Sequence, residues 1–155
     1  MTSVSLDYTL RRMTEADLPN VLKNERRAYT HPWSEGIFLD CMGSAYESWL
    51  MIFEGRIVGH GILSAMAGEA HILNICIHPD YQSIGLGRLL VEFMLGKAEE
   101  KPVNTIFLEV RPSNRIAYKL YSSLGFNEIG IRKDYYPAFI GREDAIVLGR
   151  EVLRS

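Results

Sequence analysis

Residues 75–88 read ICIHPDYQSIGLGR and carry the strongest fold signal in the chain. An apolar run ends at Ile77, a proline follows, and Gly85 and Gly87 open the next segment. Glycine lets a backbone approach a ligand closely, and the first turn of a helix has N–H groups without intrahelical partners. The stretch therefore predicts a buried strand and a helix joined by a turn that can bind an anion such as a pyrophosphate.

The same glycines also fit a tight strand-to-helix turn that binds nothing, and their spacing alone does not separate the two interpretations. Two other phosphate motifs are excluded. A P-loop ends in Gly-Lys-Ser/Thr, whereas Gly87 is followed by Arg88. A dinucleotide fingerprint has a third glycine or alanine, and that position holds Leu90. If an anion binds, Arg88 would add a charge contact.

Towards the C-terminus, helices and strands alternate. Apolar residues at helical spacing predict an amphipathic helix over residues 85–99. A strand over 105–110 and a helix over 114–124 follow, with Gly125 suited to end that helix. Two last strands are expected at 127–133 and 145–152.

Towards the N-terminus, turn and cap signals divide the chain. Thr14 with Asp17 predicts the start of a helix that runs towards residue 29, and Ser34 can cap a second one. Strands are expected at residues 8–13, 49–53, 56–65 and 70–77, with the turn Glu54-Gly55 between the second and third of them. The pattern predicts one α/β domain over residues 1–155 with a mixed sheet.

Bulk properties exclude several classes of function. With 17 basic and 19 acidic residues, the net charge of −2 gives no broad attraction to nucleic acid or to an anionic membrane, so any basic patch would have to be local. No apolar run approaches the ~20 residues that span a bilayer, and the N-terminus does not resemble a signal peptide. Cys41 and Cys76 form no C-x-x-C pair. We therefore expect a cytoplasmic protein.

Glu109 and Tyr121 are candidates for chemistry. Glu109 lies in the apolar strand IFLEV, where an unpaired ionised side chain would be costly if buried. It could instead face solvent or pair with Arg111. Tyr121 follows Asn114 by two helical turns, so both lie on one stripe of their helix. By themselves these two residues also fit a core aromatic and a helix cap.

Taken together, the motifs resemble the GNAT acetyltransferases. The resemblance rests on the following segments: Gln82-x-x-Gly85-x-Gly87 after His78-Pro79, Leu108-Glu109-Val110-Arg111, Ser113-Asn114, Leu120-Tyr121, Leu124-Gly125-Phe126, Tyr135-Tyr136-Pro137, Gly141-Arg142-Glu143-Asp144-Ala145 and His31-Pro32-Trp33-Ser34. Within that superfamily the chain is most similar to the RimI branch, bacterial N-terminal acetyltransferases that modify a ribosomal protein. The resemblance implies the GNAT (acyl-CoA N-acyltransferase) fold, a mixed, mostly antiparallel central sheet flanked by helices, with acetyl-CoA as co-substrate.

It also implies roles for individual residues. Glu109 would be the general base, and Tyr121 would donate a proton to the departing coenzyme A thiolate. The expected acetyl-CoA contacts are Ile75, Cys76, Ile77, Ser83, Ile84, Gly85, Leu86, Gly87, Arg88 and Asn114. No histidine is placed by a local signature to activate Cys76, so a small buried hydrophobe is the preferred interpretation of that residue over a nucleophile. The four histidines lack ligand spacing, so no metal is expected.

The substrate that the resemblance implies is a protein N-terminus, the exposed alanine of a small ribosomal-subunit protein, without direct binding of nucleic acid. Three alternatives stay open. The enzyme could acetylate another amine, such as a lysine side chain, a polyamine or a drug. It could be a non-catalytic acyl-CoA sensor, although a sensor would need neither Glu109 nor Tyr121. An RNA-binding ribosome factor is disfavoured by the net charge.

Overall fold

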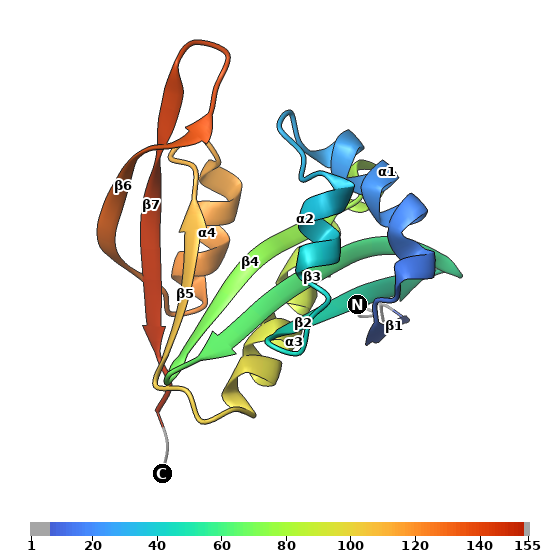
Figure 1. Cartoon of the computed structure of the whole chain (residues 1–155), viewed down its shortest axis with the longest axis horizontal. Coiled ribbons are helices and arrows are strands. Elements are labelled where there is room, and N and C mark those ends of the chain that lie inside the picture. The colour runs from blue at the N-terminus through green and yellow to red at the C-terminus, as the bar shows by residue number, and fades with distance from the viewer. Residues whose placement is uncertain (1–6, 154–155) are drawn as a thin grey trace, which may run out of the picture. The chain divides into compact units, whose positions relative to one another are not determined.

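A computed structural model describes residues 7–153 (Figure 1). Within that range, seven strands form a sheet in the order β1-β2-β3-β4-β5-β7-β6. β4 pairs with β5 in parallel, whereas β1 with β2, β5 with β7 and β6 with β7 are antiparallel. The prediction of an α/β fold with a mixed, mostly antiparallel sheet is confirmed. None of the helices described is long and apolar enough to cross a membrane.

The chain divides into two compact units, residues 7–62 with 74–91 and residues 63–73 with 92–153. The first unit contains β1 (Tyr8–Arg12), the short 3-10 helix η1 (Glu15–Asp17), α1 (Leu18–Ala28), α2 (Glu35–Asp40), β2 (Tyr46–Phe53), most of β3 (Arg56–Met66), the end of β4 (Glu69–Ile77), η2 (Pro79–Tyr81) and the start of α3 (Leu86–Glu99). In Figure 1, α1 and α2 lie in front of β2 and β3. Its core includes Val21, Leu22, Phe38, Leu50, Met51, Val58, Ile62, Leu86 and Leu90.

Local signals set some of the element boundaries of this unit, although β2 begins at Tyr46 rather than Trp49 and a 3-10 turn precedes α1. The Asp17 carboxylate accepts the Thr14 N–H at 2.8 Å, which completes the expected capping box. The Ser34 hydroxyl accepts the Ile37 N–H at 3.3 Å and begins α2. Between β2 and β3, Glu54 and Gly55 both have positive φ values, as a tight hairpin turn requires.

The second unit contains the β3–β4 turn, the rest of α3, β5 (Thr105–Val110), α4 (Arg115–Ser123), β6 (Asn127–Pro137) and β7 (Arg142–Glu151). Its core includes Met94, Leu95, Ala98, Val103, Ile106, Leu108, Phe126 and Leu148. Gly125, with φ of +94°, follows α4 as expected.

The last two strands are longer than the sequence predicts. The β6–β7 register shifts between Arg132 and Tyr136, at the point where the predicted strand 127–133 ended, and β6 continues beyond this irregularity. Beyond it, polar contacts extend the hairpin, since Arg142 Nε donates to the Asp134 carbonyl at 2.7 Å and the Asp134 N–H donates to Asp144 at 2.9 Å. β7 therefore begins in a charged segment rather than at Ala145.

Candidate active site

In the first unit, the turn before α3 presents backbone donors. Gly85 has φ of +95°, a conformation that L side chains rarely adopt, and its carbonyl accepts the Leu89 N–H at 3.3 Å. The N–H groups of Leu86 and Gly87 precede this first helical bond, so the helix offers them no acceptor. Together with the helix dipole, they make the start of α3 suitable for an anion.

Gly87 leaves space at this helix start. Apart from the adjacent residues and the helix backbone, the atom nearest to a Cβ on Gly87 would be Ile77 Cγ1, at an ordinary contact distance of 3.8 Å. Internal packing therefore does not require glycine here, whereas close approach of a ligand to the backbone would. The side chain of Gln82 donates to the Ile77 carbonyl at 2.9 Å and fixes the turn to the end of β4. The acetyl-CoA contacts expected in this turn are Ser83, Ile84, Gly85, Leu86, Gly87 and Arg88.

Cys76 lies at the end of β4 and is 1% exposed. Burial raises the pKa of its thiol, so the sulfur is protonated at neutral pH and is a poor nucleophile. Its Sγ contacts the Asn24 carbonyl at 3.9 Å. The expected burial of Cys76 is confirmed. At the neighbouring position, the Ile75 carbonyl accepts a hydrogen bond from the Tyr29 hydroxyl.

A buried polar network that the sequence did not reveal surrounds Glu25. This carboxylate is 1% exposed and accepts the Trp33 N–H at 2.9 Å, His60 Nε2 at 3.1 Å and Asn74 Nδ2 at 3.3 Å. Because a carboxylate offers only lone pairs, His60 is the donor in its contact. The ligand atoms of Glu25, His60 and Cys76 also lie within 4.8 Å of one another. Through these three hydrogen bonds, Glu25 on α1 anchors β3, β4 and the segment before α2 to one another.

In the second unit, Glu109 lies on β5 with a side chain only 8% exposed. His71 Nε2 donates to its Oε2 at 2.5 Å, and Arg132 Nε lies 3.4 Å from its Oε1. The carboxylate is thus nearly buried between two donors. The suggested pairing with Arg111 is wrong: Arg111 instead contacts Glu143 at 3.2 Å. Its guanidinium also donates to the Pro137 carbonyl at 2.8 Å.

His71 is the residue at this site that sequence reasoning missed. It pairs with Phe107 in the parallel β4–β5 register, and Glu109 follows Phe107 by two positions on the same face of the strand. Its side chain is 30% exposed, in contrast to the carboxylate it contacts. The pair joins an acceptor that is nearly buried to a titratable ring that reaches solvent, an arrangement suited to receive a proton and pass it on.

On α4, Asn114 caps the helix and Tyr121 packs inward. The Asn114 Oδ1 accepts the Ala117 N–H at 3.2 Å, so its role as a cap is confirmed. The Tyr121 ring lies edge-on to Phe126 with 6.0 Å between centroids. Burial raises the pKa of the Tyr121 hydroxyl to about 12, so at neutral pH this hydroxyl holds its proton and can donate it.

Comparison with known families identifies the chain. The acetyltransferase (GNAT) family matches residues 10–126, a segment that includes the turn before α3, Glu109 and Tyr121. The chain belongs to the acetyltransferase (GNAT) family. The resemblance deduced from the motifs is thereby confirmed.

Within the GNAT family, the chain is similar over most of its length to enzymes of one named activity. The chain is 42% identical over 140 residues to the ribosomal protein bS18-alanine N-acetyltransferase of Escherichia coli K12, covering 90% of this chain and 95% of that one. The protein of the same name from Haemophilus influenzae is 39% identical over 85% of this chain and 90% of its own. The crystal structure of the ribosomal-protein-S18-alanine N-acetyltransferase from E. coli superposes with a TM-score of 0.90 at 40% identity, covering 96% of each chain. The fold prediction is confirmed by this similarity.

Proposed function

We propose that this GNAT acetyltransferase transfers the acetyl group of acetyl-CoA to the α-amino group of the N-terminal alanine of ribosomal protein bS18. The observation that carries the proposal is the 42% identity over 140 residues to the E. coli enzyme of that name. Such a substrate agrees with the cytoplasmic location expected from the sequence.

The start of α3 would bind the pyrophosphate of acetyl-CoA. Support comes from the donors of Leu86 and Gly87 and from the space a Cβ at Gly87 would fill. The other turn residues, Ser83, Ile84, Gly85 and Arg88, would complete this contact. We assign the pantetheine and acetyl portion to backbone groups of Ile75, Cys76 and Ile77, and a further contact to Asn114.

Two side chains of the second unit would move the protons. The substrate supplies an amine that attacks the thioester carbonyl carbon directly, without an acyl-enzyme. Glu109 accepts the proton that the amine nitrogen loses, and His71 supports the carboxylate through their 2.5 Å hydrogen bond. As the carbon–sulfur bond breaks, the Tyr121 hydroxyl gives its proton to the departing sulfur, and its raised pKa ensures that the proton is present.

An α-amine suits this machinery better than a lysine. Its pKa is near 8, whereas that of lysine is about 10.4, so a far larger neutral fraction of the α-amine exists at neutral pH. The gap of about 2.5 pKa units corresponds to roughly 3.4 kcal/mol that the enzyme need not supply. A single carboxylate, held between His71 and Arg132, can then serve as the base.

The direct test is acetylation of the protein substrate. Unmodified bS18 incubated with this enzyme and acetyl-CoA should gain one acetyl group, which tandem mass spectrometry should locate on the N-terminal alanine. Acetylation confined to internal lysines would reject the proposed substrate group while retaining the acetyltransferase. Failure to modify any amine, with acetyl-CoA still bound, would favour the sensor instead.

A further inference from the structure

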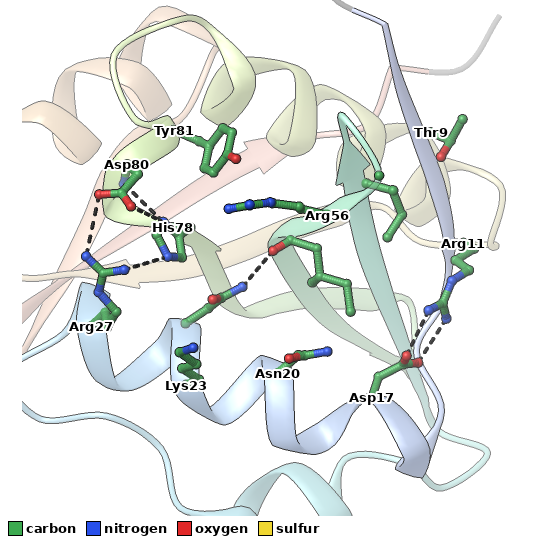
Figure 2. Close-up of a pocket in the computed structure, with 14 residues that line it drawn as sticks. Thr9, Arg11, Asp17, Asn20, Lys23, Arg27, Arg56, His78, Asp80 and Tyr81 are labelled. Atoms are coloured by element: carbon green, nitrogen blue, oxygen red, sulfur yellow. Dashed lines mark hydrogen bonds and ion pairs between the residues drawn. The ribbon is translucent and has the colours of Figure 1, made fainter.

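A polar cavity of about 790 Å³ lies in the first unit, apart from the residues assigned to acetyl-CoA. Its walls come from β1, α1, the β2–β3 turn and the segment 78–81 (Figure 2). None of the expected acetyl-CoA contacts, which lie at positions 75–77, 83–88 and 114, is among its lining residues. The cavity therefore shares no residue with the assigned acetyl-CoA contacts, although the segment 78–81 in its wall joins two of the assigned stretches.

Basic side chains dominate the cavity. Arg11, Lys23, Arg27 and Arg56 line it, against only two acidic residues. Arg11 is neutralised, because its guanidinium binds Asp17 through two hydrogen bonds of 2.8 and 2.9 Å. Arg27 is only loosely paired, at 3.5 Å from Asp80 and 3.0 Å from His78 Nε2.

Lys23 and Arg56 are the unneutralised charges. Over residues 7–153, neither has an ion pair or a side-chain hydrogen bond, and both are exposed to the cavity opening. Figure 2 shows Lys23 rising from α1 while Arg56 extends across from the strand side. Asn20, Thr9 and Tyr81 add neutral polar groups to the lining. In a chain with a net charge of −2, this is a local concentration of positive charge.

We propose that this cavity binds a small molecule with a di- or triphosphate group, of about nucleotide size. Arginine offers a planar fork of donors for phosphate oxygens, and lysine adds a compact charge. Two opposed cations suit a ligand with several negative charges. The volume lies within the ~300–1,000 Å³ usual for ligand sites. A concave, mainly polar lining favours a compact polyanion over an extended nucleic acid backbone or an apolar compound.

Calorimetric titration with sodium tripolyphosphate tests the proposal, with acetyl-CoA present at saturation to block its own site. The wild-type protein should bind one tripolyphosphate. The double variant Lys23→Gln/Arg56→Gln should bind it at least about 10-fold more weakly, since each charged hydrogen bond contributes about 1.5–3 kcal/mol. A charge-matched control, Lys119→Gln/Lys133→Gln, removes two exposed charges outside the cavity and should retain the affinity. Thermal unfolding checks that both double variants are folded.

Several outcomes would reject the proposed phosphate-binding site. One is the absence of binding by the wild type, and another is an equal loss of affinity in both double variants. Binding of tripolyphosphate only when acetyl-CoA is omitted would assign the anion to the cofactor turn. Citrate binding as tightly as tripolyphosphate would reject the phosphate class, and tighter binding of a short RNA would reject a small ligand. Among phosphates, tighter binding of a nucleoside triphosphate than of tripolyphosphate would identify the source as a nucleotide.

Discussion

Replacing Gly87 with alanine should separate ligand binding from folding. The added Cβ would lie 3.8 Å from Ile77 Cγ1, so it creates no clash with the neighbouring strand. Because φ at Gly87 is not in the left-handed region, alanine can adopt the helical conformation and should gain up to about 1 kcal/mol in helix propensity. Stability of Gly87→Ala should therefore be equal to or above that of the wild type.

Acetyl-CoA affinity should nevertheless fall. The methyl group would occupy the space through which a pyrophosphate approaches the first-turn N–H groups. Loss of one hydrogen bond to a charged group costs about 1.5–3 kcal/mol, which corresponds to roughly 10- to 150-fold weaker binding. Isothermal titration calorimetry with acetyl-CoA measures this directly.

Gly96 provides the matched control, because it lies in the same helix and a Cβ there would have nothing within 4 Å. Gly96→Ala should bind acetyl-CoA as the wild type does. If Gly87→Ala binds within two-fold of Gly96→Ala while both are folded, the start of α3 does not hold the pyrophosphate.

Four further predictions concern single side chains. Glu109→Gln should lower kcat by about 10²-fold in a steady-state assay with little change in acetyl-CoA affinity; a change of only a few-fold would leave the carboxylate a structural role. Tyr121→Phe should reduce the single-turnover rate of acetyl transfer by a similar factor, whereas equal rates would make it a packing residue only. Glu25→Leu leaves the buried donors of His60 and Asn74, and the half-buried Trp33 N–H, without their acceptor and should lower the free energy of unfolding in urea by about 3–5 kcal/mol; a loss below about 1 kcal/mol would contradict the role of Glu25 as an anchor. For Asp17, the Arg11 hydrogen bonds lower its pKa from 3.8 to about 2, so the stability it adds is present above pH 4 and is lost as pH falls towards 2. Relative to Asp17→Asn, the wild type should be about 2 kcal/mol more stable at pH 6, and this difference should shrink below pH 4 and be lost as pH falls through about 2; a pH-independent difference would reject this linkage.

Structural features that depend on residues close together in the sequence could be predicted from the sequence. The capping box at Thr14, the cap at Ser34 and the tight turn at Gly55 each depend on backbone geometry that one or two side chains determine. The strand-to-helix turn at Gly85 belongs to the same class. Such features need no knowledge of the tertiary arrangement.

Contacts between residues far apart in the chain could not be predicted from the sequence. His71 and Glu109 are 38 positions apart and meet only because β4 and β5 pair in parallel in one particular register. The anchor on Glu25 joins residues up to 49 positions apart. The polar cavity likewise combines residues from positions 9 to 81, and composition gave only the statement that a basic patch would be local.

The nature of the acceptor amine is the central claim, and a competition between two peptides tests it. One peptide has a free N-terminal alanine and no lysine; the other is acetylated at its N-terminus and contains one internal lysine. With acetyl-CoA and both peptides in one reaction, mass spectrometry gives the ratio of kcat/KM values. We expect at least about 10²-fold preference for the free alanine peptide, in line with the larger neutral fraction of an α-amine. Faster acetylation of the blocked lysine peptide would contradict it.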